Sequence, residues 1–450
     1  MGNKIVAKFG GSSVKDADAM RACVSIVKQT PDLCALVISA TWNTTNLLEK
    51  IAQRALAKDD ENSGILLKKL YTKHKTIIDD LDLSDELSET LSGLCEKAGN
   101  LATEISSKQR IDPVTMDSMY AIGELISSSI FAACLSREIN DREVVLFDMR
   151  DVLITNSNFN KASPLLNETK KMAMETILPG ISGGSRLFVG QGFIGRDVEG
   201  RTTTLGREGS DLSGSVLAWA VDACKLHIWT DVPGVATADP KFVKQVRWIP
   251  EMSYDEAQLL STFGAKVLFE RTLGPVINKN IPVFIGSTLC PNEGGTWITS
   301  EIDTNRRVTG LVLREDQSYF SVKHDGNEEA EKGVLKILED FNVTYDFFRN
   351  DGLNIYFLIN DKNLNVERFC DSLYALGFPV VVEKETGLSL LSVVGNFKNN
   401  GNVVEKLEKY LSSSHFPILK LNETENYYCV LVGNECGREL LKQLHELLCQ

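Results

Sequence analysis

Positive charge and histidine are both scarce in this chain of 450 residues. Lysine and arginine number 48 against 61 aspartates and glutamates, which gives a net charge of −13. Nucleic acids are bound through clustered cations, so this balance argues against a nucleic-acid partner. The five histidines lack the spacing of a metal site, and we expect no metal centre built from protein ligands.

Paired cysteines and long apolar runs are also lacking. The ten cysteines are scattered from Cys23 to Cys449 without a CxxC pair, as is typical of free thiols in a reducing compartment. No apolar run approaches the roughly 20 residues of a membrane span. The first residues do not form a signal-peptide core. We therefore expect a cytoplasmic protein that does not enter a membrane.

What the chain has is the composition of a globular protein, with 43% hydrophobic and 24% charged residues. Its first 300 residues alternate short β-branched runs with amphipathic patterns. Met20, Cys23, Val24 and Val27, for example, lie on one face of a predicted helix. Strands are predicted at 4–9, 34–39, 143–148, 186–189, 226–230 and 283–286, and helices at 45–56 and through most of 65–135. Such alternation predicts a mainly parallel sheet between layers of helices.

The pattern changes after Gly294-Gly295-Thr296, where an internal repeat begins. Residues 318–322 match 388–393, and residues 353–359 match 427–432. The offset of roughly 70 residues between matching starts indicates a genuine repeat, with each copy in the order β-α-β-β-α. We therefore predict a domain at 1–300 and a second region at 301–450, made of two α+β units near 310–385 and 386–450.

Lys8-Phe9-Gly10-Gly11-Ser12-Ser13 is the strongest local motif, because it follows a strand and precedes a helix. Glycines allow backbone N–H groups to approach a phosphate closely, and a helix N-terminus favours negative charge. Taken alone, the motif is also compatible with a plain tight turn. It is neither a P-loop nor GxGxxG.

Three further runs carry groups that suit anions. Residues 201–211 combine Arg201, Arg207, several hydroxyls and the start of a helix predicted at 212–221. A helix capped by Ser210 or Asp211, with solvated arginines, explains them equally well. Trp229-Thr230-Asp231-Val232-Pro233-Gly234 ends a strand where open α/β sheets commonly bind ligands. Residues 263–268 place a second lysine at a helix or turn. Each run alone is more often structural than functional.

In this order and spacing, the four motifs together resemble the signature runs of aspartate kinases. The resemblance extends through Thr45-Asn46-Leu47-Leu48, Gly123-Glu124 and residues 191–195, and so covers essentially all of residues 1–300. It implies the amino-acid kinase fold, an α/β architecture with a mainly parallel sheet sandwiched by helices. The C-terminal repeat resembles the tandem ACT modules with which aspartate kinases sense amino acids.

The resemblance implies ATP-dependent phosphorylation of the aspartate side chain to 4-phospho-L-aspartate, with roles for particular residues. The catalytic groups would be Lys8, Lys266 and Asp211. The aspartate-binding residues would be Thr45, Glu124, Arg207 and Ser210. The nucleotide-binding residues would be Gly10, Gly11, Ser12, Thr230, Asp231 and Lys241. Mg²⁺ would lie mostly on phosphate oxygens and water, so no dedicated protein cluster is expected.

The chain also departs from the family pattern at several positions. Glu208 replaces the first glycine of a frequent Arg-Gly-Gly-Ser-Asp, and Ala236 replaces an aromatic residue near the nucleotide. Phe269-Glu270 replaces a frequent His-Pro, and Thr41-Trp42-Asn43 replaces a turn of small residues. No proposed catalytic group is lost, so we expect an active enzyme with altered kinetic constants.

Two alternatives stay open at this stage. Beside an aspartate kinase, these are another kinase of the same fold, acting on glutamate or acetylglutamate, and a non-catalytic amino-acid sensor. Feedback inhibition is expected through a homodimer of the ACT-like region, with lysine as the preferred effector. Asp346 matches a lysine-contacting position of the family, and the loop at 324–333 is acidic. The competing interpretation is that these charges form a solvated face and the regulatory pocket has decayed.

Overall fold

The computed structural model describes residues 4–182, 184–265, 270–300, 302, 308–397 and 401–449. By contacts within the chain, the protein divides into two compact units. Unit 1 comprises Met1–Val235, Trp248–Tyr254 and Leu268–Ile302. Unit 2 comprises Ala236–Arg247, Asp255–Val267 and Asp303–Gln450. The domain limits predicted at residues 300 and 385 stay predictions.

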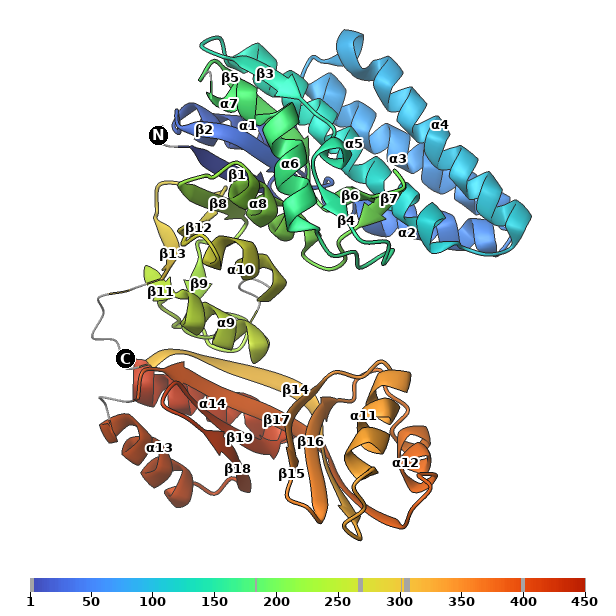
Figure 1. Cartoon of the computed structure of the whole chain (residues 1–450). Helices are drawn as coiled ribbons and strands as arrows, with labels where there is room; N and C mark the ends of the chain where they lie inside the picture. Colours follow the sequence, from blue (N-terminus) through green and yellow to red (C-terminus); the bar gives the residue numbers. More distant parts are fainter. Residues whose placement is uncertain are drawn as a thin grey trace. The chain divides into compact units, whose positions relative to one another are not determined.

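Unit 1 is built on an eight-stranded sheet in the order β11-β13-β12-β8-β1-β2-β5-β3 (Figure 1). The strands are β1 (Ile5–Phe9), β2 (Leu33–Ile38), β3 (Glu143–Leu146), β5 (Arg186–Gln191), β8 (Lys225–Thr230), β11 (Glu251–Ser253), β12 (Val283–Ser287) and β13 (Gly295–Thr299). All neighbours pair in parallel except β12 and β13. The predicted mainly parallel sheet is therefore confirmed. A small second sheet holds β4 (Ile154–Thr155), β6 (Ile194–Asp197) and β7 (Thr202–Thr204).

Helices cover both faces of this sheet (Figure 1). Phe9 of β1 belongs to a core shared with α1 (Ala17–Lys28) and α5 (Pro113–Glu138), where its ring lies 5.7 Å from that of Phe131. Lys8 points to the opposite face, toward α8 (Gly209–Ala220), because successive strand residues alternate between faces. The predicted stripe of α1 is buried at all four positions. The remaining helices of unit 1 are α2 (Thr44–Leu56), α3 (Asp60–Asp80), α4 (Ser84–Lys108), α6 (Leu166–Thr176), α7 (Leu178–Ser182) and α10 (Glu270–Ile277).

One helix corrects our statement that no apolar run approaches the length of a membrane span. Among the described residues, α5 is long and apolar enough to cross a membrane by length and composition. However, 72% of its most apolar window is buried inside the protein. It packs against the sheet and the long helices of residues 60–108, so its apolar surface is explained as core. Sequence inspection missed it because polar residues such as Glu124 interrupt the run.

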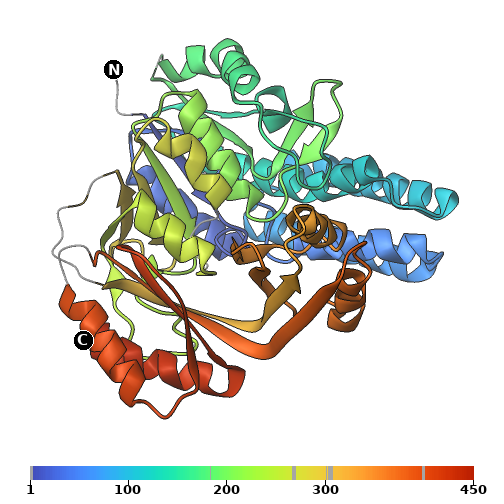
Figure 2. The same cartoon turned by 60° about the horizontal axis from the view of Figure 1, so that its bottom comes forward.

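Unit 2 is built on a six-stranded antiparallel sheet in the order β15-β16-β14-β17-β19-β18. Its strands are β14 (Val308–His324), β15 (Tyr345–Asn350), β16 (Asn354–Asn360), β17 (Val380–Gly395), β18 (Ile418–Glu423) and β19 (Tyr427–Gly433). Its helices are α11 (Ala330–Asp340), α12 (Val366–Tyr374), α13 (Gly401–Ser413), α14 (Asn434–Cys449) and most of α9 (Tyr254–Thr262). The chain thus passes twice through the predicted order β-α-β-β-α. Figure 2 shows the long strands β14 and β17, which pair side by side and join the two repeats into one sheet.

Each repeat has its own apolar core. In the first, the rings of Phe320 and Phe357 stack 5.2 Å apart beneath α11 and α12. In the second, α13 and α14 pack on β17 and β19. That second core also contains Ala238 and Val243, which come from a segment some 70 residues before β14. Thr237 Oγ1 and His445 Nε2 lie 2.8 Å apart and attach the same segment to α14.

Candidate active site

Three loops meet at the carboxyl ends of neighbouring strands in unit 1. β1 pairs in parallel with β2 on one side and with β8 on the other, so the loops that follow these strands emerge at one edge of the sheet. These loops contain Gly10–Ser13, residues 39–43 and residues 231–234. The carboxyl edge of a parallel sheet is the usual ligand site of open α/β folds.

The glycine loop after β1 is held close to its neighbours by backbone contacts. Gly10 N–H donates to Trp229 O over 3.0 Å, and Trp42 N–H donates to Gly11 O over 2.9 Å. A Cβ on Gly11 would lie only 2.7 Å from Ala40 O, which leaves no room for a side chain. The close approach of the two loops explains why glycine stands at position 11.

Lys8 and Asp211 form an ion pair with a distance of 2.5 Å between Nζ and Oδ1, and both side chains are about nine-tenths buried. A Cβ on Gly10 would lie 3.5 Å from Lys8 Nζ, so the ammonium group stands beside the glycine loop. Two of the three predicted catalytic groups are thus in direct contact. The third, Lys266, lies outside the described residues.

The helix that carries Asp211 begins earlier than the sequence predicts. We expected a helix at 212–221 with Ser210 or Asp211 as its N-cap, but α8 spans Gly209–Ala220 and its N-cap is Glu208. Glu208 adopts the left-handed conformation with φ of 54°, which favours glycine. The earlier start places Ser210 and Asp211 in the first helical turn, and Asp211 thereby faces Lys8.

Glu208 also changes the electrostatics of this corner. Loss of hydration and the neighbouring Asp211 carboxylate raise the pKa of its carboxyl group, while Lys8 and Arg207 act in the opposite direction. Arg207, the predicted carboxylate clamp, is an exposed residue next to it. Glu208 therefore adds negative charge within interaction range of the Lys8–Asp211 pair.

Glu124 on α5 is a buried carboxyl group with an unused oxygen. Its side chain is 3% exposed, and Oε1 accepts the Ala40 N–H at 3.3 Å. Oε2 is buried and has no hydrogen-bond partner among the residues that the structure describes. Burial raises the pKa of Glu124 to about 8. A buried acceptor without a partner is costly, and a ligand cation such as an ammonium group would satisfy it.

The structure places the other predicted aspartate-binding residues on elements around this loop cluster. Thr45 lies in the first turn of α2, directly after the loop that contains Ala40. Ser210 packs against Gly192, where an added Cβ would lie 2.6 Å from Ser210 Oγ. Gly192 N–H in turn donates to Ile38 O at the end of β2. The loops after β2 and β5 and the start of α8 are thereby joined.

The predicted nucleotide residues fall into two groups. Thr230 ends β8, its Oγ1 donates to Asp231 Oδ1 at 3.0 Å, and its carbonyl oxygen accepts the N–H of Thr288. Thr288 Oγ1 also bonds to Ser13 Oγ at 3.1 Å, next to the predicted Ser12. Lys241 belongs to unit 2, and its role in nucleotide binding stays a prediction.

Sequence inspection missed Lys73 and His74, which lie on α3 behind the loop after β2. Lys73 Nζ donates to Trp42 O at 2.5 Å and to Thr44 Oγ1 at 2.8 Å. His74 Nε2 lies 2.9 Å from Thr41 Oγ1. Burial lowers the pKa of His74 to about 4 and that of Lys73 to about 8. No sequence motif predicts a role for a Lys-His pair on an ordinary amphipathic helix, and only the fold shows what these side chains contact.

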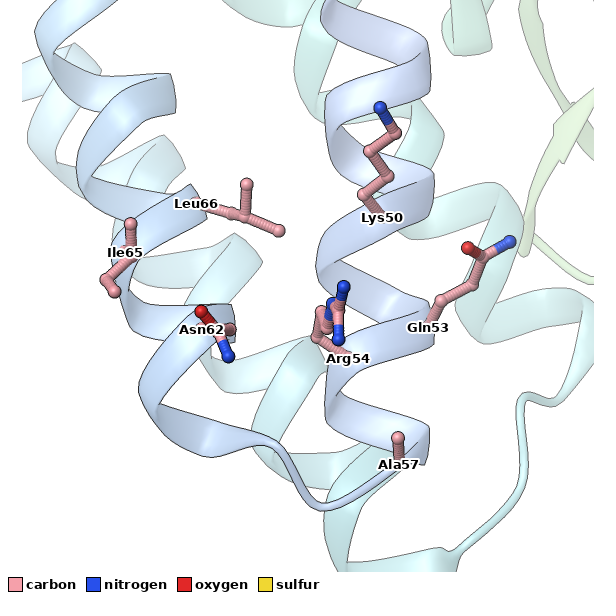
Figure 3. A pocket seen from close by; sticks show the side chains of 7 residues that line it. All are labelled: Lys50, Gln53, Arg54, Ala57, Asn62, Ile65 and Leu66. Carbon is pink, nitrogen blue, oxygen red and sulfur yellow. The ribbon is translucent and has the colours of Figure 1, made fainter.

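A cavity of about 500 Å³ lies at the other end of α2 (Figure 3). It is lined from α2 and α3 by Lys50, Gln53, Arg54, Ala57, Asn62, Ile65 and Leu66. None of the predicted site residues lines it. Within the described ranges, no three His, Cys, Asp or Glu side chains are grouped so that they could hold a metal ion.

In unit 2, the predicted effector residue is already engaged. Asp346 on β15 forms an ion pair with Arg314 of β14. Arg314 Nε also donates to Gln317 Oε1 at 3.2 Å. The acidic stretch predicted as a loop at 324–333 includes the first turn of α11, where Glu331 accepts a hydrogen bond from Asn350 and Lys332 pairs with Glu329.

These features agree with comparisons to known proteins. A model of the amino acid kinase family matches residues 3–287, so the chain belongs to that family. Within it, the chain is an aspartokinase by descent. The lysine-sensitive aspartokinase 3 of Escherichia coli is 31% identical, with 100% of both chains covered. The aspartokinase of Chlamydia pneumoniae is 28% identical over 98% of this chain and 97% of its own.

Solved structures give the same result. The crystal structure of E. coli aspartokinase III with aspartate and ADP, described as the R-state, has a TM-score of 0.83 and 30% identity, with 99% of this chain and 100% of that chain covered. The T-state complex of that enzyme with lysine and aspartate has a TM-score of 0.81 and 29% identity, with both chains fully covered. The predicted family and fold class are confirmed.

Proposed function

We propose that this protein transfers the γ-phosphoryl group of ATP to the side-chain carboxylate of aspartate and releases ADP. The observation that carries the proposal is the double contact of Ala40. Its N–H donates to Glu124, while its carbonyl oxygen lies so close to Gly11 that a Cβ there would be 2.7 Å away. One residue thus fixes the distance between an unpaired buried carboxyl group and a glycine loop suited to phosphate.

The residues divide the work according to charge. The Lys8 ammonium neutralises charge on the transferring phosphoryl group, and Asp211 holds that ammonium in place. Backbone N–H groups of Gly11 and Ser12 bind phosphate oxygens, and Gly10, whose own N–H donates to Trp229 O, lets the backbone approach the phosphates closely. The mechanism is one of positioning and charge cancellation, because carboxylate and phosphoryl group repel each other until their charges are offset.

On the acceptor side, Glu124 binds the α-ammonium group of aspartate. Arg207 binds a carboxylate of the substrate, as a guanidinium does with two parallel bonds, and Thr45 and Ser210 orient the remaining groups. Lys266 acts with Lys8 on the phosphoryl group, and Thr230, Asp231 and Lys241 bind the nucleotide. Bound together with ATP, Mg²⁺ would supply further positive charge at the phosphates. The ten free cysteines suit a reducing compartment such as the cytoplasm.

The test is ADP release with ATP, Mg²⁺ and aspartate, with aspartyl phosphate trapped as the hydroxamate. We expect turnover of aspartate and little or none of glutamate or acetylglutamate at equal concentration. Glu124→Gln keeps the volume of the side chain but cannot ionise, and it should raise KM for aspartate by at least tenfold. Equal turnover of glutamate would assign the chain to a different branch of the family. No turnover of any of these acceptors would favour a non-catalytic sensor.

For regulation, we propose feedback inhibition by lysine through a homodimer of the ACT-like sheet. The lysine-sensitive E. coli relative supports this choice, as does the carboxylate of Asp346. Because Arg314 already pairs with Asp346, a lysine ammonium has to displace a guanidinium. We therefore expect inhibition only at high lysine concentration, with Arg314→Ala shifting the curve to lower concentration.

The regulatory test is a titration of lysine, threonine and methionine at subsaturating aspartate, with size-exclusion chromatography coupled to light scattering for the oligomeric state. Asp346→Ala should abolish the lysine effect and leave kcat without effector unchanged. Inhibition by threonine alone, or lysine inhibition that survives Asp346→Ala, would contradict the effector assignment. A monomer at assay concentration would contradict the dimer.

A further inference from the structure

A directed chain of hydrogen bonds runs behind the turn at residues 40–44. His74 Nδ1 lies 2.8 Å from Leu70 O, a carbonyl oxygen that can only accept, so Nδ1 carries the proton. The pKa of His74 is about 4, so the ring is neutral and Nε2 is an acceptor. It therefore accepts from the hydroxyl of Thr41, at 2.9 Å.

The remaining directions follow from that first one. Because the Thr41 hydroxyl donates its hydrogen bond to His74, its oxygen accepts a hydrogen bond from the hydroxyl of Thr44 over 2.6 Å. Thr44 Oγ1 in turn accepts from Lys73 Nζ over 2.8 Å. Thr41, Thr44 and His74 are at most 1% exposed, so water does not compete with these bonds. The hydroxyls of Thr41 and Thr44 each donate one hydrogen bond and accept one, which is the condition for a rigid buried network.

The front of the same turn contacts both halves of the proposed site. Trp42 N–H donates to Gly11 O in the phosphate loop, and Ala40 N–H donates to Glu124. Lys73 Nζ also donates to the carbonyl oxygen of Trp42 at 2.5 Å. Lys73 is therefore the only described side chain that bonds both the buried threonine pair and the backbone of residue 42.

We propose that Lys73 is a positioning residue that fixes the turn at residues 40–44 against α3. In this way it sets the distance between the phosphate loop and Glu124, which binds the ammonium group of the substrate. The proposal rests on the function proposed above. Loss of the lysine leaves the network with one donor too few and releases the carbonyl of residue 42. Misplacement by a fraction of an ångström at a reacting pair lowers the rate strongly, because it removes the near-attack geometry.

The test compares three substitutions on α3. Lys73→Met should lower kcat/KM for aspartate by tenfold or more, while KM for ATP changes by less than twofold, because the Gly10 contact to Trp229 is untouched. Lys73→Arg retains N–H donors for both contacts and should stay within threefold of the native enzyme. Lys75→Met is the matched control, because Lys75 pairs with Asp79 and does not reach the turn. Equal kinetics for Lys73→Met and Lys75→Met would overturn the proposal.

A double-mutant cycle tests whether Lys73 acts through Thr44. Because both residues belong to one network, the combination of Thr44→Val with Lys73→Met should lower kcat/KM for aspartate by no more than about twice the fold-change of the larger single effect. If the two losses in kcat/KM multiplied fully, Lys73 would act independently of Thr44, and the proposed network would be overturned. Should Lys73→Met fail to fold, the cycle is run with Lys73→Gln, and the same two outcomes decide.

A readout without catalysis separates this proposal from the proposed function. Trp42 is 63% exposed and its indole reports on the turn directly. The emission of Trp42, taken as the native protein minus Trp42→Phe, should shift or become more quenchable in the Lys73→Met background. If the native protein does not phosphorylate aspartate but this change occurs, only the proposed function is wrong. If the emission is unaltered, Lys73 does not hold the turn.

Discussion

The buried carboxyl group of Glu124 leads to a prediction about stability that opposes its role in binding. Burial raises the pKa of Glu124 from 4.5 to about 8. Below pH 4.5 the group is protonated in both the folded and the unfolded protein, and it does not affect folding. Between pH 4.5 and 8 the unfolded chain loses the proton while the folded protein keeps it. The free energy of unfolding therefore falls as pH rises through this window.

The size of the effect follows from the shift. A change of one pKa unit corresponds to about 1.4 kcal/mol, so the full shift destabilises the folded protein by up to about 5 kcal/mol at pH 8 and above. Glu124→Gln removes the titration and keeps the shape of the side chain. We expect this variant to gain stability over the native protein progressively from pH 5 to pH 9, while it loses affinity for aspartate.

Urea unfolding of both proteins, at intervals of one pH unit and without substrates, measures this difference. Glu138→Gln is the matched control, because Glu138 ends the same helix and its side chain is half exposed, with Lys28 as its partner. Its difference from the native protein should change little over the range, because its ion pair lies at the surface. A difference between native protein and Glu124→Gln that does not change with pH would refute the reasoning. So would the absence of proton release when aspartate binds to the native enzyme at pH 7.

Three further predictions concern the phosphate side. Lys8→Ala should lower kcat on the order of a hundredfold with an unchanged circular dichroism spectrum, and a normal kcat would mean that the glycine loop serves another purpose. Glu208→Gly should lower KM for aspartate or ATP by removing a like charge, and should also raise the unfolding midpoint by relieving a left-handed backbone that costs about 1 kcal/mol. A rise in KM would show that Glu208 assists binding. Gly11→Ala should abolish measurable ATP binding in calorimetry, because its Cβ would lie 2.7 Å from Ala40 O, whereas Gly64→Ala, with nothing within 4 Å, should bind normally. Normal binding by Gly11→Ala would mean that the loops can separate at little cost.

Much of the fold could be predicted from the sequence because local patterns determine it. The buried stripe of α1 and the apolar runs of β1 and β2 have the periodicities of a helix and of fully buried strands. The internal repeat was visible because each copy has to bury a similar face.

The details that were missed depend on contacts that are distant in sequence. Asp211 and Ser210 are good N-caps by propensity, yet α8 begins at Gly209, and Ser210 in its first turn packs closely on Gly192, a contact distant in sequence. Lys73 and His74 look like surface and core residues of an ordinary helix, and their role depends on a turn some 30 residues earlier. Glu124 was identified from the family motif, but its unpaired oxygen follows only from the fold.

The two compact units are not consecutive in the chain, and this has a practical consequence for dissecting the protein. Ala238 and Val243, which precede β12 and β13 of the kinase sheet, complete the apolar core of the second ACT-like repeat. A gene fragment that stops at residue 300 would expose these side chains to water and leave Thr237 without His445. We therefore expect such fragments to aggregate. To exchange the sensor for that of a relative, the segments 236–247 and 255–267 should be exchanged together with the C-terminal region.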